Sequence, residues 1–137
     1  MTGGAATARL VALTGRRVLV AEDEYMIAQE IAAMLSEAGA ETLGPVATVA
    51  NALRVIAAEA GRIDAALLDV NLRGEMVWPV VDALLARGVP VVLATGYDAG
   101  AMPPAYARLP RCEKPATPRD LGHVLARTLA PQAPAGG

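Results

Sequence analysis

Phenylalanine is absent from the 137-residue chain, and cysteine, histidine, lysine and tryptophan occur once each. The single cysteine, Cys112, excludes an internal disulfide and is typical of a protein from a reducing compartment. One cysteine and one histidine also exclude a metal site built from Cys and His ligands. With aromatic residues at 3%, the core must consist of Val, Leu, Ile, Ala and Met. The length suits one domain of ordinary size.

A strong charge of either sign is also absent. The formal net charge is −2, so electrostatics gives no support for nucleic-acid binding. No apolar stretch is long enough to span a bilayer, and residues 1–17 have neither the basic start nor the apolar centre of a signal peptide. We therefore expect a cytoplasmic protein that binds neither nucleic acid nor a membrane.

Strand-like and helix-like patterns alternate along the chain. Short apolar runs bounded by turn residues predict strands at 17–21, 41–47, 64–70, 89–95 and 111–115. Between them, apolar residues at helical spacing predict helices at 25–38, 49–60, 77–87 and 117–129. The Gly-Pro pair in the second strand favours an edge position. This alternation indicates an α/β fold with a mostly parallel, five-stranded sheet flanked by helices.

Composition suggests where the folded domain begins and ends. Residues 1–15 are small and rich in Gly and Ala, and we expect them to form a flexible arm. Residues 16–130 form the predicted domain, and residues 131–137 are expected to be a disordered tail. The segment between Thr95 and Lys114 is rich in Gly and Pro, so a fourth helix there is expected to be short or irregular.

Polar residues follow the predicted strands at one edge of the sheet. In open parallel sheets, binding sites form at the carboxyl ends of the strands. Taken singly, each polar residue also fits a helix cap, a turn or a surface charge. Their coincidence at successive strand ends favours one shared site. The residues placed at this edge are Glu22, Asp23, Asp69, Asn71, Thr95, Gly96, Lys114 and Pro115.

The chemistry of these side chains points to a metal and a phosphate. Neighbouring carboxylates raise one another's pKa unless a cation lies among them, and Mg²⁺ suits a few carboxylates plus water. A pocket that combines a divalent cation with the Lys114 ammonium and the Thr95 hydroxyl is equipped to bind phosphate. Asp69 is then a candidate nucleophile that accepts a phosphoryl group.

The same residues carry a family likeness. An acid pair after the first strand, an Asp after the third, a Thr after the fourth and a Lys-Pro pair after the fifth resemble the receiver domain of bacterial two-component response regulators. The likeness runs from about Arg17 to Leu129, and "LLDVNLRGE" and "CEKP" are its most specific segments. It implies a flavodoxin-like sheet with the strand order 2-1-3-4-5.

The resemblance implies a phosphoacceptor and its metal ligands. Asp69 would accept a phosphoryl group from a phosphohistidine on a sensor histidine kinase or a histidine phosphotransfer protein. Mg²⁺ would be bound by Asp23, Asp69 and the backbone carbonyl of Asn71, with Glu22 helping through water. The protein would be a stoichiometric phosphoacceptor with self-dephosphorylation rather than an enzyme.

The resemblance also implies contacts to the phosphoryl oxygens. These would come from the side chains of Thr95 and Lys114 and from the backbone amides of Val70 and Gly96. The Lys114–Pro115 peptide bond would be cis, an isomer that is otherwise rare.

Two positions, Arg111 and Tyr97, concern the conformational switch of receiver domains. Most receivers have Tyr or Phe three residues before the Lys, where this chain has Arg111. An Arg is not buried cheaply in an aromatic slot, so the usual coupling between Thr and an aromatic ring is not expected. The loop "LATGYD" is similar to that of an alphaproteobacterial subgroup of receivers. Tyr97 is therefore a candidate for part of the switching role, although a Tyr on a loop surface fits equally well.

The output and two alternatives stay open. No helix-turn-helix or basic patch is present, so we expect a single-domain receiver with a protein partner, a phosphorelay role or a phosphate-sink role. The main alternative is a receiver-like interaction module that is never phosphorylated, which Arg111 favours. A small phosphatase with Asp69 as nucleophile fits less well, because Asn71 stands where such enzymes have an acidic proton donor.

Overall fold

The computed structural model describes residues 10–59, 61–96 and 102–130. Within these ranges the strands are β1 (Arg17–Ala21), β2 (Glu41–Val46), β3 (Ala65–Asp69), β4 (Asn71–Leu72), β5 (Glu75–Met76), β6 (Val91–Thr95) and β7 (Arg111–Glu113). The α-helices are α2 (Tyr25–Glu37), α3 (Val49–Ala58), α4 (Trp78–Leu85) and α5 (Pro118–Leu129). Two short 3₁₀ helices are η1 (Val11–Leu13) and η3 (Pro104–Tyr106).

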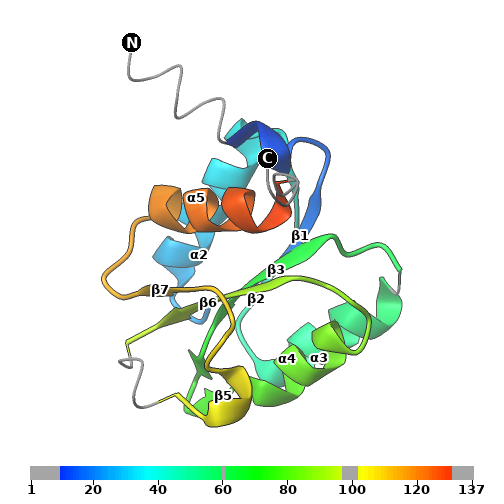
Figure 1. Ribbon diagram of the computed structural model, residues 1–137, viewed down its shortest axis with the longest axis vertical. Coiled ribbons are helices and arrows are strands. Elements are labelled where there is room, and N and C mark those ends of the chain that lie inside the picture. The colour runs from blue at the N-terminus through cyan, green and yellow to red at the C-terminus, as the bar shows by residue number, and fades with distance from the viewer. Residues whose placement is uncertain (1–9, 60, 97–101, 131–137) are drawn as a thin grey trace, which may run out of the picture.

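The central sheet has five parallel strands in the order β2-β1-β3-β6-β7 (Figure 1). Because β6 and β7 are the fourth and fifth strands of this sheet, the predicted flavodoxin-like order is confirmed. The strand with the Gly-Pro pair, β2, lies at an edge as predicted. Every residue of β3 and β6 is buried, as expected for strands covered on both faces.

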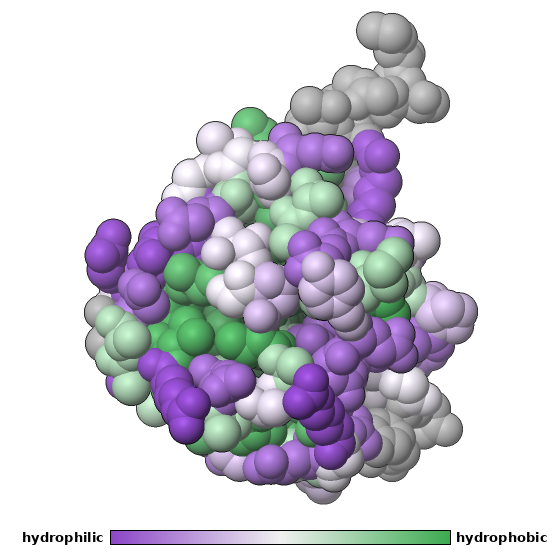
Figure 2. Space-filling model, turned by 180° about the vertical axis from the view of Figure 1, so that it is seen from behind, coloured by the Kyte–Doolittle hydropathy of each residue, from purple (hydrophilic) through white to green (hydrophobic). Residues whose placement is uncertain are grey.

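Helices cover both faces of the sheet. Figure 1 shows α2 and α5 on one side and α3 and α4 on the other. Each side has its own cluster of buried Val, Leu, Ile and Ala residues, and no aromatic side chain is among the buried residues of the described ranges. Seen from behind in Figure 2, apolar surface gathers in one central area bordered by hydrophilic side chains. None of the described helices has the length and apolar character needed to cross a bilayer.

The folded part begins earlier than predicted. Residues 11–13, which we expected to belong to a flexible arm, form η1. The side chain of Leu13 is fully buried, and it belongs to the core cluster beneath α2 and α5. The composition of residues 1–15 misled the prediction because two leucines inside a Gly/Ala-rich stretch, Leu10 and Leu13, are enough to anchor a turn against the core. The predicted tail, residues 131–137, lies outside the described residues.

The segment before β7 holds no regular helix in its described part. From Met102 onward it contains only η3, one turn long, as the prolines predicted. Met102 is buried against the cluster under α3 and α4. Residues 97–101, which include Tyr97, lie outside the described ranges, so the predicted switching role of Tyr97 stays a prediction.

Candidate functional site

Three buried polar side chains lie together at the carboxyl edge of the sheet. Among the described residues, Glu22, Asp69 and Thr95 are the polar or charged residues that are buried, with 4%, 7% and 1% of their surface exposed. Glu22 directly follows β1, Asp69 is the last residue of β3, and Thr95 is the last residue of β6. These three strands are consecutive in the sheet. Burying such groups is costly unless they are paired, so their convergence calls for a chemical explanation.

Lys114 connects all three of these residues. Its ammonium Nζ lies 2.6 Å from Oδ2 of Asp69 and 3.7 Å from Oε1 of Glu22. Its backbone N–H donates to the carbonyl of Thr95 at 2.8 Å. Partial burial lowers the pKa of Lys114, but the hydrogen bond and charge of Asp69 outweigh it, and the net direction is upward. The chain's single lysine is therefore held, charged, against the predicted phosphoacceptor.

The three acids form a ligand set suited to a hard cation. Glu22, Asp23 and Asp69 each offer a carboxylate oxygen within 4.8 Å of the other two. Helix α2 begins at Tyr25, and its N-cap residue is Glu24, whose side chain makes no capping hydrogen bond. Neither Glu22 nor Asp23 is thus the N-cap of α2, which removes the plainest alternative to a metal role. All-oxygen donors of this kind fit Mg²⁺.

Glu22 is the acid most affected by this crowding. Burial raises the pKa of Glu22 to about 7, and the neighbouring carboxylate of Asp69 adds to the rise. The backbone N–H of Glu24 and the Lys114 ammonium act in the opposite direction. Near neutral pH, Glu22 therefore binds a proton more readily than an ordinary carboxyl group does, and a bound cation would compete with that proton.

This shift predicts a pH-dependent stability for the metal-free protein. The pKa of Glu22 in the folded state lies above its ordinary value of 4.5, so the folded state binds more protons than the unfolded state between pH 4.5 and 7. The free energy of unfolding should fall as pH rises through that window, by about 2 kcal/mol more in the native protein than in Glu22→Gln. Urea unfolding in EDTA at several pH values measures this. Parallel stability curves for the two proteins would contradict it.

A small hairpin holds Asp23 and Asn71. Strands β4 and β5 pair antiparallel, and the turn between them contains Arg73 with a φ of 54°. The backbone N–H of Arg73 donates to Oδ2 of Asp23 at 2.8 Å, and that of Gly74 donates to Oδ1 of Asn71 at 2.7 Å. The turn between β4 and β5 thus fixes one of the acids through a backbone amide.

One predicted contact is wrong. The backbone N–H of Val70 donates to the carbonyl of Ala94 at 3.1 Å, so it belongs to the pairing between β3 and β6. The next amide, that of Asn71, instead points into the site and donates to Oδ1 of Asp69 at 3.2 Å. Successive amides of an extended chain point in opposite directions, and this alternation is the signal that should have selected Asn71.

Two other predicted residues are found at the same edge. Gly96 directly follows β6 and is exposed, with open space where a Cβ would lie. The Lys114–Pro115 peptide bond is cis, as the resemblance implied. The structure therefore brings together the predicted site residues that lie in its described ranges.

Arg111 is held away from the acids. It pairs in register with Leu93 on β6, and its guanidinium donates to the carbonyl of Ala107 at 3.0 Å. The side chain is partly exposed. The guanidinium thus stays at the surface, where it fastens β7 to the turn that contains η3, in keeping with the cost of burying an Arg.

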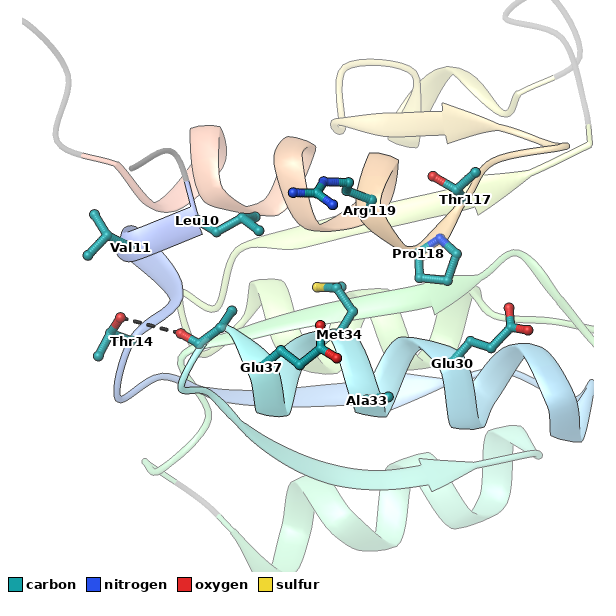
Figure 3. A pocket seen from close by; sticks show the side chains of 11 residues that line it. Leu10, Val11, Thr14, Glu30, Ala33, Met34, Glu37, Thr117, Pro118 and Arg119 are labelled. Carbon is teal, nitrogen blue, oxygen red and sulfur yellow. Dashed lines mark hydrogen bonds between the residues drawn. The ribbon is translucent and has the colours of Figure 1, made fainter. Parts of the chain in front are cut away.

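A hollow elsewhere on the surface shares none of these site residues. A groove of about 640 Å³ runs between η1, α2 and the start of α5 (Figure 3). Its floor is apolar, with Leu10, Met34 and Pro118, while Glu30 and Arg119 lie at its sides. No group of three acid, His or Cys ligands lies in it among the described residues. Among the described residues, the candidate metal ligands are therefore gathered at the acidic edge of the sheet and not in this groove.

Known proteins were compared at the levels of sequence and structure. No family model matches the chain, and no curated protein does so. Among solved structures, SdrG from Sphingomonas melonis Fr1 is 39% identical over 86% of this chain and 98% of its own, with a TM-score of 0.69. The BeF3-activated conformation of SdrG from Pseudomonas melonis Fr1 is also 39% identical, over 83% of this chain and 96% of its own, with a TM-score of 0.68.

Two further structures share the fold. The receiver domain of the hybrid histidine kinase CckA is 25% identical over 83% of this chain and 99% of its own, with a TM-score of 0.69. PhyR, a response regulator from Brucella abortus, is 24% identical over 92% of this chain, with a TM-score of 0.73. This chain spans only about half of PhyR, 52% of its length, and the likeness to PhyR shows the fold alone.

Proposed function

This chain belongs to the response regulator receiver family of two-component systems, and we propose that it accepts a phosphoryl group on Asp69. The donor we propose is a phosphohistidine of a sensor histidine kinase or of a histidine phosphotransfer protein. The observation that supports this most directly is the buried Asp69 carboxylate, held 2.6 Å from the Lys114 ammonium beside two further acids.

The transfer needs a positioned nucleophile and charge neutralisation. A carboxylate oxygen of Asp69 forms a new P–O bond, while the P–N bond of the donor breaks and its electron pair returns to the imidazole. Oδ2 is held by Lys114 at 2.6 Å, and Oδ1 accepts a longer bond of 3.2 Å from the Asn71 amide. We expect Oδ1 to be the attacking atom. Lys114 and the Thr95 hydroxyl then contact the phosphoryl oxygens, together with the Asn71 and Gly96 amides.

Mg²⁺ would balance the negative charge of the three acids that Lys114 alone does not neutralise. Glu22, Asp23 and Asp69 would hold it, with the Asn71 carbonyl as a further ligand, and when bound it neutralises charge on the phosphoryl oxygens. Ionised carboxylates alone would repel an incoming phosphate, so the acids need that cation. The residues themselves orient the acceptor: Arg73 fixes Asp23 through its amide, and Lys114 fixes Asp69.

We propose a signalling role rather than catalytic turnover. Each chain would carry one phosphoryl group, which is lost later by hydrolysis of the acyl phosphate. The consequence would be a conformational change that is read in the cytoplasm by a protein partner, not by DNA. The net charge of −2 agrees with the absence of a nucleic-acid role.

The test is the intact mass of the protein after incubation with acetyl phosphate. We expect a gain of one phosphoryl group in Mg²⁺ and none in EDTA, because the acids require the cation. Treatment with hydroxylamine should remove the gain, as it does for an acyl phosphate. No gain at any Mg²⁺ concentration would overturn the proposal and leave a receiver-like interaction module, the reading that Arg111 favours.

A further inference from the structure

An aromatic stack joins the segment before β7 to helix α4. The rings of Trp78 and Tyr106 lie 4.4 Å apart between centroids and are inclined by only 5°. The hydroxyl of Tyr106 donates to Oδ1 of Asp82 at 2.8 Å. We call Trp78, Tyr106 and Asp82 the aromatic latch. Both rings are partly buried against the core under α3 and α4, in a chain that has few aromatic residues.

One side of the latch is connected to the phosphoacceptor through α4. Val70 directly follows Asp69, and its carbonyl accepts a hydrogen bond from the backbone N–H of Val77 at 2.9 Å. Val77 is the N-cap of α4, and Trp78 is the first residue of that helix. One backbone hydrogen bond therefore connects the residue after Asp69 to the residue before Trp78, and a shift of the backbone at Asp69 would act on Trp78 through it.

The other side is connected through β7. Lys114, which contacts Asp69, directly follows this strand, and its backbone N–H is bonded to Thr95. Arg111, at the start of the same strand, holds the carbonyl of Ala107 at 3.0 Å, and Ala107 is next to Tyr106. Movement of the Lys114 end of β7 would thus act on Tyr106 through this contact.

We propose that the aromatic latch regulates phosphorylation of Asp69, by stabilising the unphosphorylated arrangement and opening when the phosphoryl group is present. This inference rests on the proposed function. In the free chain, Lys114 is bonded directly to Asp69. To contact phosphoryl oxygens that lie farther out, its ammonium would leave Oδ2, and the proposal requires that β7, which Lys114 follows, then shifts relative to the start of α4. Such a shift would separate the two rings and lose the stacking energy, which depends on their close contact.

Thermodynamic linkage gives the direction in which loss of the latch should change the affinity for a phosphoryl analogue. A contact that is present in the free state and lost in the phosphorylated state opposes phosphorylation by its own free energy. Its removal should tighten binding of a phosphoryl analogue. An aromatic pair of this kind corresponds to a change of about 3-fold to about 10-fold in affinity.

The test uses beryllofluoride with Mg²⁺ as the phosphoryl analogue. Bound fluoride is followed by ¹⁹F NMR, and the latch is followed by tryptophan fluorescence, which reports on Trp78 alone because it is the chain's single tryptophan. In the native protein we expect the fluorescence to change in step with the bound fluoride. Tyr106→Leu should show the altered fluorescence before any ligand is added and should bind beryllofluoride about 3-fold to about 10-fold more tightly.

A matched variant separates the ring from its hydroxyl. Tyr106→Phe keeps the stack and loses only the bond to Asp82, so it should retain the ligand-induced change. Unchanged Trp78 fluorescence at saturating bound fluoride would overturn the latch while leaving the phosphoacceptor intact. Equal or weaker binding by a folded Tyr106→Leu would do the same. If no fluoride binds, the proposed function fails and the latch fails with it. If Tyr106→Leu does not fold, the native and Tyr106→Phe titrations still decide the question.

Discussion

Asp69→Asn is expected to reduce phosphoryl uptake from acetyl phosphate to below detection. The amide is nearly isosteric with the carboxylate but has no nucleophilic oxygen that can form a stable acyl phosphate. The fold should survive, because removal of one carboxylate relieves repulsion at Glu22, and Lys114 keeps an acid 3.7 Å away. Intact mass spectrometry in Mg²⁺ measures the uptake, and urea unfolding checks the fold.

A matched variant at the opposite edge of the sheet controls for the loss of a charge. Asp64 directly precedes β3, and its Oδ2 accepts the backbone N–H of Arg17 at 2.8 Å. Asp64→Asn keeps an acceptor there and should take up phosphate like the native protein. Uptake by a folded Asp69→Asn would mean that another residue is the acceptor, and the assignment of Asp69 would be wrong.

Gly44→Ala is expected to lower the free energy of unfolding by about 3 kcal/mol. Gly44 lies in β2 with a φ of +97°, a conformation that alanine adopts only under strain. A Cβ there would lie 2.7 Å from the backbone N of Val46 and 3.1 Å from the carbonyl O of Val20. Both are backbone atoms in paired strands, so neither gives way cheaply. Urea denaturation with a two-state analysis measures the loss.

Gly122→Ala provides the contrast. A Cβ at Gly122 would lie 2.7 Å from Sδ of Met34, which is the flexible end of a side chain. The residue lies within α5, where alanine is favoured over glycine by about 1 kcal/mol. We expect this variant to be close to the native stability. Equal losses for the two glycines would show that backbone strain at Gly44 is not the cause.

The sequence predicted the sheet and most of the site because both depend on simple periodicities. Apolar runs placed the strands, and the polar residues that follow them had to meet at one edge of a parallel sheet. The meeting of Asp69 and Lys114 at this edge was predicted in this way. The position of the Asn71 amide was missed, because the alternation of successive amides was not applied to the choice between Val70 and Asn71.

Other features depend on tertiary contacts that have no periodic signal. Leu13 anchors η1 in the core, although its neighbours in sequence are typical of a loose arm. Trp78 and Tyr106 are separated by 27 intervening residues and meet only because η3 packs against α4. The carbonyl partner of Arg111 lies in the same irregular segment. No spacing rule predicts these pairs.

No aromatic side chain is buried among the residues that the structure describes, and this has a consequence for spectroscopy. Near-ultraviolet circular dichroism usually reports on tertiary packing, and its loss with retained far-ultraviolet signal is a criterion for a molten globule. Among the described aromatic residues, Tyr25 is 73% exposed, and only Trp78 and Tyr106 have a fixed environment, that of the stack. Opening of that contact would therefore imitate a molten globule while the aliphatic core stayed fully packed. Methyl NMR signals, rather than aromatic optical signals, are the proper measure of order in this core.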